Sequence, residues 1–473
     1  MKKSLYVYVG ALVPALLVAA GVWSPLKQAV AKNPNKAPLY MVDPFWPQPL
    51  PIDTESNGAS KPWVTGEVAG TCIDSKDNLF TVNRGPQGNL VAPETQVAKP
   101  SPAVVEYDRK GNVANAWPAN IPTPGVNGGY TAPTEPAGCA SPACAAHGVP
   151  TSIHGCFVDY QDNVWVGGNG DGIFQKYSHD GTLIMQLGTA HVCDNPPSNT
   201  CGNTCTGTPP VCNPAANKSH TLLNEPPDVA VDPSNGDIYV ADGYGNHRIV
   251  VFDKNGNWLR QWGCPGNGPG QFAAGDGGHP HCVVLGKDGL VYACDRGQDR
   301  IQVFEKNPKN CKPCDSPGYT GGEPQCDPVR IIPVIPGTGT PGLGTAGSAW
   351  DVEFCVDKSQ TFMFDADGGD EIVWEFDHAA ALAAGNDCGP GSSTCSILAG
   401  FGRPGHMAGD FTFLHTLAID SKGNLFTGET INGRRVQRFE HQGDVSDKKL
   451  EDFHPAGSPT WTLKHYDPRF PHD

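Results

Sequence analysis

Short apolar runs separated by polar turns recur along the chain and predict β-strands. The stretch from Pro226 to Gly263 contains four such runs, PDVAVD, DIYVAD, RIVVFD and WLRQWG, and each gap between them holds a turn sequence such as Pro-Ser-Asn-Gly or Lys-Asn-Gly-Asn. Runs of β-branched and aromatic residues bounded by such turns are typical of strands and not of helices. Four strands in about 40 residues make one antiparallel unit of the size of a propeller blade.

Five further copies of this unit follow the same pattern at uneven spacing. The six copies are predicted at 66–118, 150–189, 222–263, 278–337, 346–402 and 411–465. They predict an all-β fold, a six-bladed β-propeller with Cys-rich insertion loops, over residues 66–473. The Pro-rich arm at 32–65 could supply the strand that closes the ring. The segment WTLKHYD near the C-terminus is predicted as the outer strand of the last blade.

Composition and charge agree with this fold and limit the classes of function. The 473 residues include 58 glycines and 45 prolines, which suits an all-β chain with many turns, and no long amphipathic helix is predicted. The formal net charge of −16 argues against nucleic-acid binding, because proteins that bind nucleic acid neutralise phosphates with basic side chains. We therefore expect no nucleic-acid partner.

Residues 1–31 resemble an export segment. Lys2 and Lys3 precede a long apolar run, and Ala29-Val30-Ala31 has the pattern of a cleavage site. Two interpretations remain open: a cleaved signal peptide, or an uncleaved N-terminal anchor that tethers the protein to a membrane. Both place the propeller outside the cytoplasm, as a periplasmic, secreted or membrane-anchored protein.

The 17 cysteines agree with an extracytoplasmic location, because disulfides form in oxidising compartments. Many of them fall in the insertion loops, where bridges would hold segments that have no core of their own. Cys311 and Cys314 form a Cys-Lys-Pro-Cys motif that could be half a metal site or a redox pair. No βαβ pattern surrounds this motif, so we expect structural disulfides here. The odd count leaves at least one cysteine free or bonded to another chain.

Histidine occupies one register position in alternate blades. His154 in SIHGCFVD, His281 in HPHCVVLG and His415 in FLHTLAID each begin the first strand of their unit, whereas the other three units have non-histidine residues there. Alternate blades of a six-bladed ring lie about 120° apart, so the three imidazoles should converge on the central channel. Three histidines with an open fourth position suit catalytic zinc, although nickel, copper or iron would also fit. The alternative is that each histidine is a hydrogen-bonded residue of the channel wall.

Polar side chains in three loops are predicted to surround the same channel mouth. Each loop joins the second and third strands of a unit and holds Arg84, Tyr244 or Arg296. A tyrosine hydroxyl beside a divalent metal and a cation loses its proton more readily and could act as a base, and arginine could clamp a substrate carboxylate. Any one of them could also be an ordinary loop residue. The acidic segment 365–371 in the matching loop could hold calcium, but a solvated acidic turn is the favoured interpretation.

The repeats resemble NHL repeats, and PPDVAVDPSNGDIYVADGYGNHRIVVF followed by QWG resembles the peptidyl-α-hydroxyglycine α-amidating lyase family. The resemblance covers about 66–440 and implies a six-bladed propeller with zinc on His154, His281 and His415. It also implies that Tyr244 is the catalytic tyrosine and that Arg84 and Arg296 are the active-site arginines. The family's structural calcium uses an acidic residue directly after the third histidine, where this chain has Thr416, so the same calcium site is not expected.

The resemblance implies cleavage of a carbinolamide, a hydroxylated C-terminal glycine, into an amide and glyoxylate. We therefore predict a zinc-dependent lyase whose substrate, a small molecule or a peptide, binds at the channel mouth. One alternative is a non-catalytic NHL propeller that binds a protein partner through its insertion loops. The other is a metal-dependent hydrolase, such as a lactonase, although its usual carboxylate and Asn ligands are not present at this register.

Overall fold

Antiparallel strands dominate the part of the chain that the computed structural model describes. That part comprises residues 36–54, 58–87, 90, 94–117, 149–150, 152–274, 277–317, 319, 321, 324–334, 347–383, 396–446 and 460–462. The predicted export segment 1–31 and the cysteines at 139, 144, 388 and 395 lie outside it. Among the described residues, no helix has the length and apolar character needed to cross a membrane.

Six antiparallel sheets form the blades, five of them with four strands and one with five, and each is built mainly from consecutive strands. The first three blades consist of β4 (Val68–Ile73), β5 (Leu79–Asn83), β7 (Val104–Tyr107) and β8 (Val113–Trp117); β9 (Ile153–Val158), β10 (Val164–Gly168), β11 (Ile173–Tyr177) and β12 (Leu183–Leu187); and β15 (Asp228–Val231), β16 (Ile238–Asp242), β17 (Arg248–Phe252) and β18 (Trp258–Trp262).

The last three blades use the same order, with strands from distant parts of the chain added at two outer edges. They consist of β19 (Val283–Leu285), β20 (Leu290–Asp295), β21 (Arg300–Glu305) and β24 (Arg330–Pro333); β25 (Asp351–Phe354), β26 (Phe362–Asp367), β27 (Ile372–Asp377) and β28 (Ile397–Phe401), with β32 (Thr460–Thr462) as a fifth strand; and β29 (Leu414–Ile419), β30 (Leu425–Glu429), β31 (Arg435–Ser446) and β1 (Lys36–Val42).

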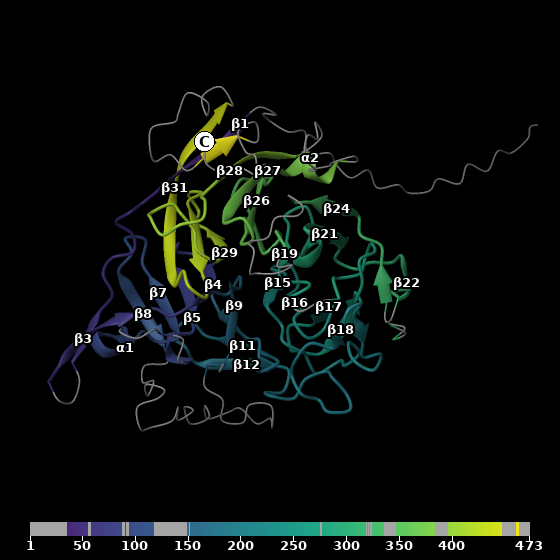
Figure 1. The fold of residues 1–473 in the computed structure, drawn as a ribbon. Helices are drawn as coiled ribbons and strands as arrows, with labels where there is room; N and C mark the ends of the chain where they lie inside the picture. The colour runs from purple at the N-terminus through teal and green to yellow at the C-terminus, as the bar shows by residue number, and fades with distance from the viewer. Residues whose placement is uncertain are drawn as a thin grey trace, which may run out of the picture.

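The inner strands form a closed ring, which confirms the predicted six-bladed propeller. β4 contacts β9, and contacts then run through β15, β19, β25 and β29 back to β4. Figure 1 shows inner strands β4, β9, β15, β19 and β29 gathered near the centre of the molecule. Central strands are buried on both faces: in β16, Tyr239 and Ala241 pack toward the fourth blade, and Ile238 and Val240 pack toward the second. The core therefore lies between blades.

A recurring aspartate explains why the hairpins turn where they do. In six turns, an Asp carboxylate accepts hydrogen bonds from the backbone N–H groups two and four residues later. This local bonding is the reason that Asp favours turns. The six residues are Asp74, Asp108, Asp159, Asp253, Asp357 and Asp420.

The two ends of the described chain lie on neighbouring blades. β1 pairs with β31, as Figure 1 shows for the purple strand beside the yellow sheet, so the Pro-rich arm contributes the outer strand of the sixth blade. The prediction for WTLKHYD was wrong: β32, which contains Trp461, pairs with β28 at the edge of the fifth blade. The outer edge of the sixth blade is already occupied by β1, so the C-terminal segment pairs with the next available edge.

The remaining elements are short and lie in loops and insertions. Strands of two to five residues form small sheets outside the blades: β2 (Ile52–Thr54), β3 (Ser60–Val64) and β6 (Lys99–Pro100); β13 (Cys205–Thr206) with β14 (Val211–Cys212); and β22 (Cys311–Pro313) with β23 (Pro324–Cys326). The helices are α1 (Glu94–Val97), α2 (His378–Leu382) and the 3-10 turns η1 (Gly85–Gln87) and η3 (Arg296–Gln298).

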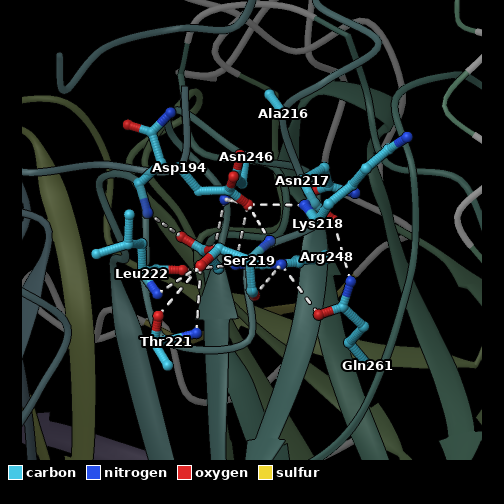
Figure 2. A network of polar contacts seen from close by, with 12 residues as sticks. Asp194, Ala216, Asn217, Lys218, Ser219, Thr221, Leu222, Asn246, Arg248 and Gln261 are labelled. Carbon is cyan, nitrogen blue, oxygen red and sulfur yellow. Dashed lines mark hydrogen bonds and ion pairs between the residues drawn. The ribbon is translucent and has the colours of Figure 1, made fainter. Parts of the chain in front are cut away.

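A buried arginine fastens the Cys-rich insertion between the second and third blades to the third blade (Figure 2). Arg248, which has no exposed surface, donates to Asp242 Oδ2 at 2.9 Å, to the Ser219 and Leu222 carbonyls and to Gln261 Oε1. Its guanidinium also lies 3.4 Å from Asp194 Oδ2. Here a buried cation is fully compensated by carboxylates and carbonyls, as burial of a charge requires.

Six disulfides bridge described residues, an arrangement typical of an oxidising, extracytoplasmic environment. They join Cys72–Cys156, Cys193–Cys201, Cys205–Cys212, Cys264–Cys314, Cys282–Cys294 and Cys311–Cys326. Cys311 and Cys314 thus belong to two separate bridges and not to a redox pair, and Cys355 is the free cysteine of the described part.

Loss of the Cys72–Cys156 bridge should destabilise the ring more than loss of the Cys205–Cys212 bridge. The first closes a loop of 84 residues between neighbouring blades, and the second closes one of 7 residues. The loop-entropy relation gives about 4–5 kcal/mol for the former and about half of that for the latter. Urea denaturation of the paired Cys→Ala variants measures both; equal losses would contradict the loop-length argument.

Candidate metal centre

The inner strands of alternate blades bring the three predicted histidines together. His154 lies in β9, His415 lies in β29, and His281 lies two residues before β19. One ring nitrogen from each lies within 4.8 Å of the others, and the ring centroids are 4.7–5.2 Å apart. Each side chain is 3 % exposed. The three imidazoles therefore converge in a buried position on the ring axis.

Backbone carbonyls of the intervening blades orient the imidazoles. His154 Nδ1 lies 3.0 Å from the Pro227 carbonyl and His281 Nδ1 lies 2.6 Å from the Trp350 carbonyl. A carbonyl can only accept, so these Nδ1 atoms carry the proton and the Nε2 lone pairs are left for a ligand. His415 Nδ1 completes no hydrogen bond, although the Ala69 carbonyl interacts with the ring. Such outer partners fix the tautomer of metal-binding histidines.

The surroundings keep all three imidazoles neutral. Burial, together with the positive charge of Arg84, lowers the pKa of His154 to about 3. Burial and neighbouring charged groups also hold the pKa values of His281 and His415 well below the ordinary value of 6.5. Neutral imidazole is the form that coordinates a metal, so these rings are ready to bind one near neutral pH.

Acid should weaken the metal-free protein through these histidines. The folded pKa of His154 is about 3 and the unfolded value is about 6.5, so between these values the unfolded chain binds more protons. Above about pH 7 this difference does not affect the free energy of unfolding. Below pH 6.5 it lowers the free energy of unfolding progressively, by about 2 kcal/mol at pH 5. Urea denaturation of the metal-free protein at pH 5 and 8 tests this.

A His154→Gln variant isolates that contribution. Burial raises the pKa of Asp228 to about 7 and of Glu353 to about 8, and these carboxyls change stability with pH in the opposite sense. Both carboxyls are present in the wild type and in His154→Gln, so their effect cancels when the unfolding free energies of the two proteins are subtracted at each pH. The same pH dependence in both proteins would contradict the prediction.

Tyr244 directs its hydroxyl toward the histidines. It lies in the loop after β16, and its Oη is 3.3 Å from His154 Nε2 and 3.2 Å from His281 Nε2. Gly278 makes this approach possible: its φ is +79°, and a Cβ there would lie 2.7 Å from Tyr244 Cε2 and 2.8 Å from His281 Cδ2. Any other residue at 278 would therefore displace the tyrosine or the histidine.

Arg296 is a buried cation with no acidic partner among the described residues. It is 5 % exposed, its Nε has no hydrogen-bond partner, and none of the ion pairs in the described ranges involves it. Its guanidinium lies 4.2 Å from the Trp350 ring centroid and 5.6 Å from that of Tyr244. Arg248 shows how this chain compensates a structural arginine, and Arg296 lacks such compensation. A negatively charged ligand would supply it.

Arg84 is held differently from Arg296. Its Nη1 forms an ion pair with Glu67 Oε2 at 2.9 Å, and its Nε donates to the Ile153 carbonyl at 2.8 Å, beside His154. Its charge still lowers the pKa values of His154 and His415, so it lies near the metal-binding rings. Because Glu67 already neutralises Arg84, Arg296 is the better candidate for binding an anion.

Sequence reasoning missed Glu67 and Trp350. Glu67 lies in no recognisable motif, and only the fold places it beside Arg84. Trp350 could have been found from the repeat, because it occupies the position in the fifth blade that histidine occupies in alternate blades. Its carbonyl and ring contact His281 and Arg296.

The prediction of a solvated acidic turn at 365–371 was wrong. Strand β26 continues through Asp367, so Asp365 and Asp367 are completely buried, and Glu371 is 6 % exposed. Glu371 accepts hydrogen bonds from the Phe413 and Leu414 N–H groups and so holds the start of β29, next to His415. This segment positions a strand.

The position after His415 carries no carboxylate. The Thr416 hydroxyl is 3.0 Å from the Thr71 hydroxyl, and both side chains are buried. Two hydroxyls are weak ligands for calcium, which prefers carboxylate and carbonyl oxygens in larger number. The expectation that the implied calcium site is missing here remains consistent with these residues.

The residues at the centre fit a divalent transition metal. Three neutral imidazoles with inward-facing nitrogens supply three ligands, and the Tyr244 hydroxyl stands near the remaining position. Zinc takes this set in a tetrahedral site with an open fourth position. The donor set does not select zinc over copper, nickel or iron.

Comparisons with known proteins agree with the predicted repeats. Residues 223–252 match the family profile described as "NHL repeat". The human "NHL repeat-containing protein 3" is 26 % identical over 278 residues, which cover 57 % of this chain and 57 % of that protein. The rat "Peptidylglycine alpha-amidating monooxygenase" is 40 % identical over 102 residues, or 20 % of this chain and 10 % of that protein.

One shorter relative is named as a lyase. The Caenorhabditis elegans "Probable peptidyl-alpha-hydroxyglycine alpha-amidating lyase pgal-1" is 41 % identical over 83 residues, which cover 17 % of this chain and 22 % of that protein. The chain thus spans about half of its human relative and smaller parts of the amidating proteins. The chain carries an NHL repeat and is distantly similar to proteins of peptide amidation.

Proposed function

We propose that this chain is a metal-dependent lyase that cleaves a carbinolamide, R–CO–NH–CH(OH)–COO⁻, into the amide R–CO–NH₂ and glyoxylate. The observation that carries this proposal is the buried, uncompensated Arg296 beside three converging neutral imidazoles and the Tyr244 hydroxyl. A set of metal ligands with a buried cation beside it suits a substrate that carries a hydroxyl and a carboxylate on the same carbon.

Each side chain has a defined task in this reaction. A divalent ion on the three imidazoles would supply Lewis acidity toward the substrate hydroxyl. Tyr244, acting as the tyrosinate after losing its own hydroxyl proton, accepts the proton of the substrate hydroxyl, and its oxygen lies beside the imidazole nitrogens. The O–H electron pair becomes the second bond of the glyoxylate carbonyl, the C–N bond breaks, and its electron pair goes to nitrogen. The nitrogen takes up one proton, so the reaction is balanced without oxidant or water.

Arg296 binds the carboxylate that remains on glyoxylate. Its buried guanidinium can donate two parallel hydrogen bonds, and in a site shielded from water this pairing is both strong and directional. Burial and, to a smaller extent, the positive charge of Arg84 keep the His154 and His415 rings neutral, and Glu67 forms an ion pair with that arginine. The relatives named for peptide amidation support this choice of substrate class, and the short matched segments leave the natural R group open.

Glyoxylate release from α-hydroxyhippurate tests the proposal. The purified protein is assayed with and without a chelator, and the same sample is analysed for metal. We expect chelator-sensitive release from protein that holds about one equivalent of zinc. Protein loaded with metal that releases no glyoxylate would overturn the lyase and favour a binding propeller or a metal-dependent hydrolase. Release that is unaffected by complete metal removal would overturn the role of the three histidines.

A further inference from the structure

We propose that Trp350 is a positioning residue that holds Arg296 at the distance from the metal centre that an α-hydroxy carboxylate requires. The inference rests on the proposed function, since it concerns the carboxylate end of the same substrate. It assigns a role to a side chain that carries no acid, base or metal-binding group. Three sets of contacts carry it.

The first set connects Trp350 to the cation. The Arg296 guanidinium carbon lies 4.2 Å from the centroid of the indole ring, within the range of a cation–π contact. Arg296 makes no ion pair within the described ranges, and its Nε is unpartnered, so the indole ring is the group that packs against its guanidinium. The contact occupies the face of the guanidinium and leaves its edge donors available to a carboxylate.

The second set connects the same residue to the metal ligands. The Trp350 carbonyl accepts from His281 Nδ1 at 2.6 Å, and the indole centroid lies 5.7 Å from the His281 ring and 5.8 Å from the His415 ring. One residue therefore touches the cation with its side chain and a metal ligand with its backbone. The separation between the cation and the metal centre is fixed through Trp350.

The third set shows that the indole is rigidly held. Its Nε1 donates to the Gly347 carbonyl at 2.7 Å, and its backbone N–H donates to Ala366. A Cβ added at Gly368 would lie 2.8 Å from the indole, so the backbone packs directly against it. Trp350 is 4 % exposed. A ring fixed in this way is pre-organised to hold Arg296 before the substrate arrives.

Binding of two non-reacting ligands provides the test without turnover. Hippurate has the substrate carboxylate and no hydroxyl, and hippuramide replaces that carboxylate with a neutral amide. Calorimetry on the metal-loaded protein should show that the wild type prefers hippurate. In Trp350→Leu the hippurate affinity should fall about 30-fold while hippuramide binding and metal content stay unchanged, and Trp350→Phe should retain most of the preference.

A double-mutant cycle with Arg296→Leu separates positioning from packing. If Trp350 acts through Arg296, Trp350→Leu should add little to the loss of hippurate affinity that Arg296→Leu already causes. Additive losses, an unchanged preference for hippurate in Trp350→Leu, or no preference in the wild type would each overturn the inference. If Trp350→Leu lacks a cooperative thermal transition, Trp350→Met is measured in its place.

The two proposals fail in different ways. A wild type that prefers hippurate and loses this preference in Trp350→Leu supports the role of Trp350 even when no glyoxylate is released. Glyoxylate release with equal KM in the wild type and Trp350→Leu would keep the lyase and overturn the role of Trp350.

Discussion

Replacing His281 with alanine is expected to remove the bound metal and to lower kcat/KM for α-hydroxyhippurate by about 10³-fold or more. The loss follows because a three-histidine site with one ligand deleted holds its ion weakly, and Lewis acidity contributes several kcal/mol to the transition state. His281 is also the ligand whose Nδ1 is held most closely, at 2.6 Å from the Trp350 carbonyl. Metal analysis and steady-state kinetics on the same preparation measure both effects.

His220 provides the matched control for this substitution. It is an exposed histidine that stacks on Trp258, with 3.7 Å between ring centroids, and it is not part of the three-histidine cluster. His220→Ala should retain metal and activity. A His281→Ala protein that keeps a full equivalent of metal would show that the three histidines are not the ligand set.

Replacing Tyr244 with phenylalanine is expected to lower kcat by about 10²–10⁴-fold while the metal stays bound. The substitution removes only the hydroxyl group, whose oxygen lies 3.2–3.3 Å from two imidazole nitrogens. Loss of a positioned general base typically lowers the rate by about 10²–10⁴-fold. Because the phenyl ring still fills the space against Gly278, the effect should appear in kcat and much less in stability.

Tyr160→Phe is the control, since Tyr160 is 53 % exposed. It should leave kcat unchanged. Full turnover in Tyr244→Phe with metal present would exclude tyrosine as the base, and the proton acceptor would then have to come from another group at the channel mouth.

The blades and the three histidines could be predicted because both obey the repeat. Strand lengths follow from β-branched runs, and the hairpin turns follow from an aspartate that bonds two and four residues ahead, as in Asp74 and Asp253. A residue at a fixed place in the repeat occupies a fixed place on the ring, so His154, His281 and His415 could be placed together without coordinates.

The features that could not be predicted depend on contacts between residues that occupy unrelated positions in the repeat. Glu67 neutralises Arg84, and Trp350 lies against Arg296, yet neither pairing leaves a pattern in the sequence. The acidic segment was misjudged because composition cannot show that β26 extends through Asp367 into the interior. The edge position of β32 depends on which edges were free after β1 had paired.

The pairing of β1 with β31 has a consequence for how the protein matures. His415 lies in the sheet that β1 completes, so the first strand of the described chain and one of the last must meet before the centre is assembled. The chain could form its middle blades early, but the three imidazoles would converge only after β1 had paired with β31 and the ring had closed. An ion that needs all three imidazoles would then bind only the closed ring and stabilise it against opening. Metal uptake would thus report ring closure.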